Sequence, residues 1–298
     1  MKKFHFLDGL KIGGIENQAL TLSSEGDKNE ENYLVNLNKK INEYSNKFLN
    51  QNKYKNLKII SFQRKENVFI CLMVFKIIKK YKPKNIIIYF NNVNSLWVVL
   101  GAKLAGNHNI AICIQNAAKS LSLKNFKTII LLKTFNKLNV KLIPCSRAIL
   151  SSYLNIDNKI KFGPIIPNCI SKKHLQKEIK IIKKNKKLNK IKNVLMIARL
   201  DKIKDQETLI KAYSKLKNKC NLFLVGDGQK RKRLEQLSIE LDLDPKKIFL
   251  GSRLDIPKLL SLADIFAFST TEDEGFGIVL IEAMAAGLPI IATDVSAC

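Results

Sequence analysis

Long apolar runs are missing from this 298-residue chain. No run approaches the roughly 20 consecutive apolar residues that a helix needs to cross a bilayer. The first residues, MKKFHFLDGLKIGG, hold only a short apolar patch that Asp8 and Lys11 interrupt, so they do not resemble a secretory signal. We therefore expect a globular protein that works in the cytoplasm.

Spacings typical of metal or disulfide chemistry are also missing. The cysteines are widely scattered, with no C-x-x-C spacing and mostly apolar neighbours. This distribution favours reduced, buried thiols over a metal site or disulfides. No internal repeat of fixed period is visible. The cysteines concerned are Cys71, Cys113, Cys145, Cys169, Cys220 and Cys298.

Acidic residues are few, because 25 Asp and Glu stand against 52 Lys and Arg, which gives a formal net charge of +27. Such a charge attracts polyanions. A compositional bias competes with this interpretation, since Lys, Ile and Asn are used heavily everywhere in the chain. Nucleic-acid binding is therefore the weaker hypothesis. Contact with an anionic membrane surface stays open, because the apolar and basic stretches of the first half could supply a patch.

The chain does contain an alternation of strand-like and helix-like segments. Residues 85–90, NIIIYF, form the continuous apolar run that is typical of a parallel strand buried on both faces. The alternation predicts a doubly wound α/β domain over residues 1–170. We expect a polar loop at 25–31, strands at 5–7, 33–35, 57–62, 85–90, 110–114, 140–144 and 160–166, and helices at 68–80, 96–105, 126–138 and 148–154, with a Lys/Asn-rich helix between the second and third strands.

A lysine-rich segment separates this domain from a second one. Residues 172–192 contain ten Lys against one Glu, which predicts either an amphipathic helix or a charged connector at the boundary. The alternation then restarts and predicts a second α/β domain over residues 193–298. Ligands of such sheets bind outside the carboxyl ends of the strands, often between domains. We expect strands at 193–197, 221–225, 248–250, 265–268 and 290–293, and helices at 206–216, 231–241, 256–262 and 276–286.

The last expected helix holds a single ionisable side chain, Glu282, in an apolar segment that Pro289 ends. An unpaired buried charge costs several kcal/mol, so this carboxylate either turns to water or has a buried partner. Helical spacing predicts a buried stripe on the same helix. The stripe consists of Phe276, Val279, Leu280, Ala283, Met284 and Gly287.

Candidate phosphate-binding residues follow several of the expected strands. Arg199 and Lys204 come after the strand at 193–197, and Arg offers a bidentate fork where Lys offers a point charge. Gly226-Asp227-Gly228 resembles a turn that cradles a phosphate or faces a ribose, although it lacks the third glycine of a dinucleotide fingerprint. Gly13 and Gly14 are expected in a loop, where they allow close approach to a ligand or simply a turn.

Glu274 lies in the loop before the last helix, eight residues ahead of Glu282. Two helical positions at this spacing differ by about 80° in direction. Both carboxylates can still border one site if Gly275 and Gly277 let backbone amides point at a ligand. Carboxylates accept hydrogen bonds from vicinal hydroxyls, which suits a sugar and a ribose. The alternative is an exposed acidic loop that Glu274 shares with its two acidic neighbours.

Four segments together resemble a known family. ARLDKIKD (198–205), LFLVGDGQKRKRLE (222–235), FLGSRLDIPKLLSLADIFAFST (249–270) and EGFGIVLIEAMAAGLPIIATD (274–294) are similar to the donor-binding domain of the retaining glycosyltransferases of family 4, which have the GT-B fold. Glu274 and Glu282 match that family's E-x7-E pair. The first half matches more loosely, through GGIE (13–16), CSRAIL (145–150) and IPNCIS (166–171).

The resemblance implies two Rossmann-like domains that face a cleft. Residues 1–170 would form an N-terminal domain on the acceptor side, 171–192 a Lys-rich connector, and 193–298 the domain that binds the nucleotide-sugar donor. Because the family continues beyond the point where this chain ends, the resemblance also implies that the second domain is incomplete.

The resemblance further implies roles for single residues. Arg199 and Lys204 would neutralise the diphosphate as the leaving group departs, and Glu274 would hold the donor sugar. Glu282 would bind the ribose. The remaining donor-binding residues would be Gly275, Phe276, Gly277, Ile278, Gly226, Gly13 and Gly14.

One position departs from the family pattern. Many relatives place a His at the end of a first-domain strand, whereas this chain has Gln115, which could hydrogen-bond a sugar hydroxyl but could not carry a proton. His5, His108 and His174 do not replace that residue, because surface or loop positions are more typical of their surroundings.

The expected protein is a cytoplasmic, retaining hexosyltransferase that depends on a nucleotide-sugar as co-substrate. Stabilisation of charge on the departing diphosphate is the core of its chemistry. No cofactor or metal is then required, and DLD at 242–244 is interpreted as a surface loop. The acceptor would be a glycan or a lipid-linked acceptor in cell-surface polysaccharide or glycolipid assembly, with a peripheral position on the inner face of the membrane left open. The alternatives are a catalytically impaired sugar-nucleotide-binding or scaffolding relative and a basic nucleic-acid-binding protein.

Overall fold

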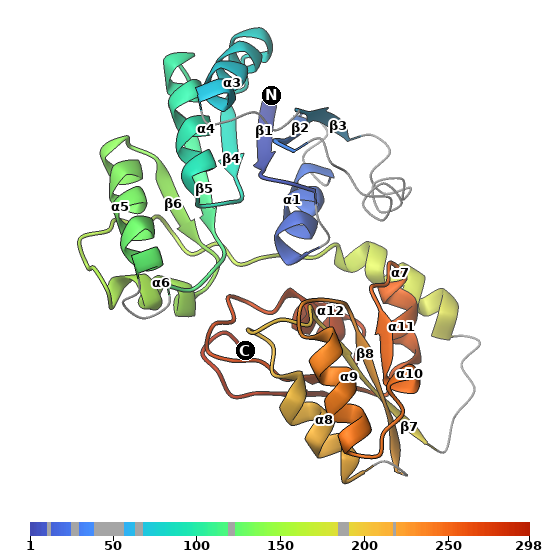
Figure 1. The fold of residues 1–298 in the computed structure, drawn as a ribbon. Helices are drawn as coiled ribbons and strands as arrows, with labels where there is room; N and C mark the ends of the chain where they lie inside the picture. The colour runs from blue at the N-terminus through green and yellow to red at the C-terminus, as the bar shows by residue number, and fades with distance from the viewer. Residues whose placement is uncertain are drawn as a thin grey trace. The chain divides into compact units, whose positions relative to one another are not determined.

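The structure is a computed structural model. It describes residues 1–10, 13–24, 30–38, 57–62, 68–118, 123–183, 191–216 and 219–298. The chain divides into two compact units, Met1–Asn168 and Cys169–Cys298, which Figure 1 shows in blue to green and in yellow to red.

The first unit is built on a parallel sheet with the strand order β3-β2-β1-β4-β5-β6. Helices α3, α4 and α5 cover one face of this sheet, and α1 lies on the other face (Figure 1). The strands are β1 (Lys2–Leu7), β2 (Glu31–Asn36), β3 (Lys58–Ser61), β4 (Asn85–Ile88), β5 (Ile110–Ile114) and β6 (Lys141–Pro144). The described helices are α1 (Gly14–Ser24), α3 (Val68–Tyr81), α4 (Val93–Leu104), α5 (Leu123–Lys137) and α6 (Arg147–Leu154).

Local sequence explains where these helices begin and how closely they pack. The side chain of Asn92 caps α4 by accepting a hydrogen bond from the Asn94 amide at 2.9 Å. Helices α3 and α4 approach so closely at Gly101 that a Cβ atom there would lie 2.4 Å from the carbonyl oxygen of Cys71. Glycine at this position therefore permits the packing of the α3–α4 pair.

Three expectations for the first unit need comment. Residues 160–166 do not form the expected strand. In this segment only the amides of Gly163 and Ile166 donate hydrogen bonds to β6, at 2.8 and 3.0 Å, and Pro164 between them has no N–H to extend the pairing. Gly14 is the first residue of α1 rather than part of a loop. The Lys/Asn-rich helix expected before residue 57, and most of the loop expected at 25–31, lie outside the described residues.

The second unit has its own parallel sheet, with the strand order β11-β10-β7-β8-β9. Its strands are β7 (Lys192–Ile197), β8 (Cys220–Val225), β9 (Phe249–Gly251), β10 (Ile265–Phe268) and β11 (Ile290–Ala292). Its described helices are α7 (Lys172–Lys183), α8 (Gln206–Ser214), α9 (Arg231–Glu240), α10 (Pro245–Ile248), α11 (Ile256–Leu262) and α12 (Ile278–Ala285).

The described part of the lysine-rich segment is a helix that belongs to this unit. In α7, Leu175 and Ile179 are buried and join the hydrophobic core of the second unit. Their spacing of four residues places them on one side of the helix, while Lys177 and Lys180 stay exposed. Of the two alternatives for this segment, residues 172–183 thus form the amphipathic helix.

Side-chain burial departs from expectation at several positions. Met284 is exposed, so the buried side of α12 is formed by Leu280 and Ala283, which the buried C-cap residue Ala286 continues. Gly277 precedes α12 with φ 67°, so the helix starts at 278 instead of 276. The one-turn helix α10 directly follows DLD, and Asp244 caps it.

No disulfide joins the cysteines among the described residues, and Cys169 and Cys298 are exposed rather than buried. No described helix is long and apolar enough to cross a membrane.

Candidate functional site

The second unit has one topological switch point, between β7 and β10. From β7 the chain continues to β8 and β9 on one side, whereas β10 and β11 lie on the other side. The loops that leave two such strands diverge and open a crevice at their carboxyl ends, which is where open α/β sheets bind ligands. These two loops are residues 198–205 and 269–277, and they carry Arg199, Lys204 and Glu274.

Backbone hydrogen bonds join the two loops. The amide of Thr271 donates to the carbonyl oxygen of Ile203 at 3.0 Å, and the amide of Asp205 donates to Ser269 at 3.1 Å. Lys204 and Thr270 form an isolated antiparallel bridge between these bonds. The backbone thus brings Lys204 next to Glu274, although 70 residues separate them in sequence.

Lys204 and Glu274 form a largely buried ion pair. The Lys204 ammonium donates to Glu274 Oε2, and their side chains are 13% and 11% exposed. The ammonium also lies 4.5 Å from the centre of the Phe268 ring, which is a cation–π contact. The Thr270 hydroxyl lies 3.2 Å from the same carboxylate oxygen. This side of the carboxylate is therefore occupied by groups of the chain itself.

The other oxygen of Glu274 faces the backbone. Its Oε1 accepts from the amides of Gly275, Phe276 and Gly277, at 3.1, 3.5 and 3.2 Å. Burial raises the pKa of Glu274, but the charge and hydrogen bond of Lys204, together with the Phe276 and Gly275 amides, outweigh burial and hold that pKa below its ordinary value. The sequence predicted that these amides would point at a ligand; in the structure they point at Glu274.

The other two charged candidates differ from this pair in exposure. The Arg199 side chain is 67% exposed and pairs with Asp201, with 3.1 Å between guanidinium nitrogen and carboxylate oxygen. Glu282 lies in α12 with its side chain half-buried. Ile278 is the first residue of the same helix. Arg199 is thus far more accessible from solvent than Lys204 of the same loop.

The Gly226-Asp227-Gly228 turn packs against the loop that follows β7. A Cβ atom on Gly226 would lie 2.0 Å from the carbonyl oxygen of Ala198, and φ at Gly226 is 138°. The Gly226 amide donates to the carbonyl oxygen of Gly251, and the Gly228 amide to its neighbour Asp227 Oδ1. These two amides donate within the chain, and the turn packs against the Arg199 loop.

The first unit has its switch point between β1 and β4. Gly13 and Gly14 stand at the start of α1, which follows β1, and the Gly13 carbonyl accepts from the Asn17 amide at 3.0 Å. At the ends of the two strands, Asp8 accepts hydrogen bonds from the side-chain amides of Asn92 and Asn94, at 3.0 and 2.7 Å. Polar groups thus gather at the switch point of this sheet too.

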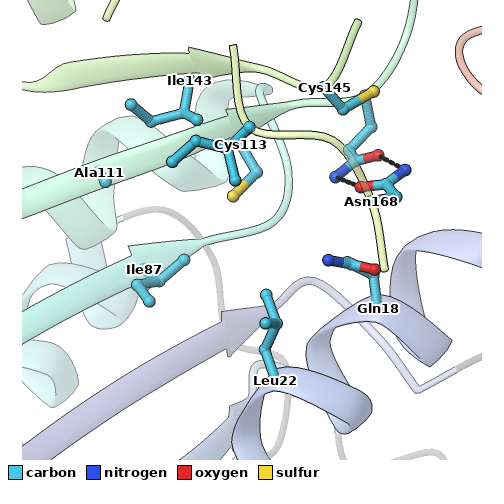
Figure 2. Close-up of a pocket in the computed structure, with 10 residues that line it drawn as sticks. Gln18, Leu22, Ile87, Ala111, Cys113, Ile143, Cys145 and Asn168 are labelled. Carbon is cyan, nitrogen blue, oxygen red and sulfur yellow. Dashed lines mark hydrogen bonds between the residues drawn. The ribbon is translucent and has the colours of Figure 1, made fainter. Parts of the chain in front are cut away.

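A pocket of about 140 Å³ lies in the first unit, on the side of the sheet where α1 packs (Figure 2). Gln115 and Asn168 line it and form a reciprocal amide pair, with hydrogen bonds of 3.0 and 2.8 Å. Each amide keeps one further donor and acceptor position, so Gln115 can still bond a hydroxyl. Burial, and next the neighbouring Cys145, raise the pKa of Cys113 to about 12. The other lining residues are Gln18, Leu22, Ile87, Ala111, Ile143, Cys145 and Ile166.

His5 is a buried residue, which corrects the expectation of a surface position. It lies in β1 at 2% exposure, with Nδ1 2.9 Å from the Tyr89 hydroxyl and Nε2 3.3 Å from Asn32 Oδ1. Burial lowers the pKa of His5 to about 4. His108 is exposed in a loop as expected, and His174 falls in α7.

No group of three His, Cys, Asp or Glu side chains within the described ranges could hold a metal ion.

Three residues of these clusters were not predicted. Thr270 comes two residues after the buried strand β10, as Arg199 does after β7, so the same signal could have identified it. Asp8 gives that signal after β1. Asn168 gives none, because its pairing with Gln115 joins residues 53 positions apart.

Comparison with known proteins adds an independent line of evidence. A family model described as "Glycosyl transferases group 1" matches residues 177–298. The chain is 28% identical over 305 residues to the N-acetylgalactosamine-N,N'-diacetylbacillosaminyl-diphospho-undecaprenol 4-alpha-N-acetylgalactosaminyltransferase of Campylobacter jejuni, covering 97% of this chain and 80% of the relative. It is 30% identical over 125 residues to the N-acetyl-alpha-D-glucosaminyl L-malate synthase of Bacillus anthracis, covering 41% of this chain and 32% of that protein.

Solved structures resemble the whole chain. Anabaena HepE in complex with UDP-glucose matches with a TM-score of 0.81 at 20% identity, over 100% of this chain and 81% of that one. WaaG, a glycosyltransferase involved in lipopolysaccharide biosynthesis, matches with a TM-score of 0.70 at 15% identity, over 100% of this chain and 82% of that one. At such low identities these likenesses establish the fold.

Proposed function

We propose, from the match of residues 177–298 to the family model described as "Glycosyl transferases group 1", that the chain transfers a hexosyl group from a nucleotide-sugar to an acceptor hydroxyl, with retention at the anomeric carbon. The chain is a glycosyltransferase with the GT-B fold, made of two parallel α/β units. One observation carries the proposal: the β7 and β10 loops meet at a switch point and join Lys204 to Glu274 there.

The diphosphate of the donor would be bound by Arg199 and Lys204. Arg199 is exposed and its only charged partner among the described residues is Asp201, whose pairing at this exposure is worth little. A diphosphate can therefore replace that partner at small cost. Lys204 bonds Glu274 through one hydrogen, and its ammonium has two more. Both cations would oppose the negative charge that develops as the nucleoside diphosphate departs, which is the main catalytic effect proposed.

The carboxylates would hold the two sugar rings. Glu282 is assigned to the ribose hydroxyls and Glu274 to the donor sugar. Glu274 is already ordered by three backbone amides and by Lys204, so it is held in one orientation before any ligand arrives. Such preorganisation lowers the entropy that binding must supply. Gly13 and Gly14 of the first unit are assigned to the phosphates, and Gln115 to a sugar hydroxyl.

The names of the relatives support a proposal for the acceptor class. The Campylobacter jejuni relative is named as acting on a diphospho-undecaprenol substrate, and WaaG as acting in lipopolysaccharide biosynthesis. We propose a lipid-linked or glycan acceptor in the assembly of a cell-surface polysaccharide or glycolipid. The enzyme would work in the cytoplasm, peripherally bound to the inner face of the membrane.

A thermal-shift panel of uridine, guanosine and adenosine diphosphates and their sugars tests this function. We expect one nucleotide series to raise the melting temperature of the second unit. Arg199→Ala and Glu282→Gln should reduce that shift severalfold. Arg233→Ala is the matched control, because Arg233 is also an exposed arginine of this unit in a surface ion pair, with Glu240.

Three outcomes are informative. A protein that responds to no nucleotide would refute the proposal. An equal loss in Arg233→Ala would remove Arg199 from the site. A nucleotide response without any hydrolysis or transfer of the sugar would leave a sugar-nucleotide-binding relative instead of an enzyme.

A further inference from the structure

The outer side of α3 is unusually apolar for a helix at the surface. Phe69 and Leu72, in its first two turns, are 55% and 51% exposed, and Val68 beside them is 57% exposed. The opposite side of the helix is buried, through Ile70, Cys71, Val74 and Ile78. The outward residues are thus not part of the core of the first unit, and their exposure to water costs free energy.

The same outward stripe becomes basic along the helix. Lys76 and Lys79 follow Phe69 and Leu72 at steps of four and three residues, which keeps all four on one side of α3. Both lysines are exposed, as is Lys80. The Lys79 ammonium lies 5.9 Å from the centre of the Phe75 ring. The stripe therefore combines large apolar side chains with cations whose stems are supported by the helix itself.

Acidic residues are scarce in the sequence that forms the surrounding layer. Residues 67–156 contain 13 Lys and Arg and not one Asp or Glu. This stretch includes α3, α4 and α5, the helices that cover one face of the first sheet (Figure 1). Lys133 of α5 pairs with Asp157, and the excess of cations over carboxylates in this layer produces a positive potential that extends about a Debye length from the surface.

Helix α5 repeats the combination within the same layer. Phe126 and Ile130 are 65% and 50% exposed and lie one helical turn apart. Lys127 is exposed between them. Apolar and basic side chains are thus exposed together on two helices of this layer.

We propose that the outer face of the α3–α5 layer, centred on Phe69, Leu72, Lys76 and Lys79, docks on the surface of an anionic lipid bilayer. The lysines bind lipid phosphates, and Phe69 and Leu72 enter the boundary between headgroups and acyl chains. The charge favours this occupant: a second copy of a chain with net charge +27 would be repelled, and a nucleic-acid backbone offers no apolar region for the two side chains. The inference rests on the proposed peripheral membrane position and names its surface.

Vesicle binding of the full chain tests the docking surface. We expect the protein to sediment with vesicles of phosphatidylglycerol and phosphatidylcholine in equal amounts, and not with phosphatidylcholine alone. Lys76→Gln with Lys79→Gln should weaken binding about 30-fold at low salt, and this difference should shrink as salt screens it. Phe69→Ser with Leu72→Ser should weaken binding about tenfold at every salt concentration.

Matched controls are available in the second unit. Ile239 of α9 is 58% exposed, and Lys211 and Lys215 of the α8 region are exposed. Ile239→Ser, and Lys211→Gln with Lys215→Gln, should bind the vesicles as the wild type does. Circular dichroism of each variant checks that it is folded.

Several results would overturn the proposal. One is vesicle binding of the α3 variants that equals that of the wild type. Another is a loss of binding in the control variants as large as in the α3 variants. A third is that the Phe69 and Leu72 substitutions abolish self-association or DNA binding instead of vesicle binding. The test uses no nucleotide, so it is distinguishable from the proposed transferase: vesicle binding without a nucleotide response would refute only the catalytic function, and a nucleotide response without vesicle binding would refute only the docking surface.

Discussion

Replacement of Glu274 by Gln probes the centre of the candidate site. The substitution keeps the shape of the side chain and an oxygen for the three backbone amides. It removes the negative charge that Lys204 pairs with, so an ammonium at 13% exposure is left with no opposite charge in the pair. Because Lys204 has the Phe268 ring as its other close neighbour, water can solvate it only partly.

The two partners should differ in the cost of their removal. Breaking a buried ion pair costs roughly 3–5 kcal/mol, and the partial exposure of Lys204 puts Glu274→Gln at about 2–3 kcal/mol. Lys204→Met leaves the carboxylate with three amides and Thr270, so about 1–2 kcal/mol is expected. The double variant has no unpaired charge and should recover about 1 kcal/mol relative to Glu274→Gln.

Urea denaturation can locate the effect within the chain. The single tryptophan, Trp97, lies in the first unit and reports its unfolding by fluorescence. Far-UV circular dichroism reports both units. Glu274→Gln should move the dichroism transition of the second unit and leave the tryptophan transition in place.

Two results would refute this reasoning. One is a cost of Glu274→Gln below about 0.5 kcal/mol, which is typical of an exposed pair. The other is a Lys204→Met variant less stable than Glu274→Gln. The pH dependence gives a further check, because the pKa of Glu274 is lower in the folded state than in the unfolded state. The contribution of Glu274 to the free energy of unfolding is therefore complete above the ordinary carboxyl pKa and is lost as the pH falls through the lowered pKa of the folded state. The difference in free energy of unfolding between wild type and Glu274→Gln should therefore become smaller only at acidic pH.

Three further predictions follow from single positions. The pKa of His5 is lowered from 6.5 to about 4, so on acidification the unfolded state takes up a proton at higher pH than the folded state does. The free energy of unfolding of the first unit should therefore fall by about 3 kcal/mol between pH 6.5 and pH 4. Urea titrations followed by tryptophan fluorescence measure this free energy, and in His5→Gln it should depend less on pH. Gly226→Ala should destabilise the second unit by about 3 kcal/mol, because its Cβ would lie 2.0 Å from the Ala198 oxygen. Equal melting temperatures of variant and wild type by circular dichroism would contradict this. Iodoacetamide near neutral pH should label the exposed Cys169 quickly and Cys113, with a pKa of about 12, very slowly, as mass spectrometry of peptides can show.

The sequence predicted most of the elements because they are locally encoded. Strand β4 is a continuous apolar run, and β5, α11 and β10 begin and end where the pattern places them. Errors occurred where a neighbour decides the outcome. Residues 160–166 look like a strand but make only two bonds to β6, and Met284 fits the apolar stripe of α12 yet faces solvent.

The candidate site divides in the same way. The motifs that follow β7 and β10 carry the resemblance to glycosyltransferases, and they singled out the charged candidates Arg199, Lys204 and Glu274 from sequence alone. Sequence spacing could not reveal that Glu274 binds Lys204 and its own following amides, because the pairing depends on the bridge between Lys204 and Thr270. Nor could it distinguish the amides of Gly226 and Gly228, which are used for packing, from amides that are free for a ligand.

The sequence by itself determined that this protein has two α/β units, carries the motifs of a glycosyltransferase and is strongly basic, since local pattern and composition encode these properties. Only the tertiary structure decided which charges pair, which glycines serve packing, that His5 is buried, and that apolar and basic side chains share the outer side of α3. The reason is physical: exposure and pairing depend on which distant residues the sheet brings together, and strand order is not contained in any local stretch of the chain.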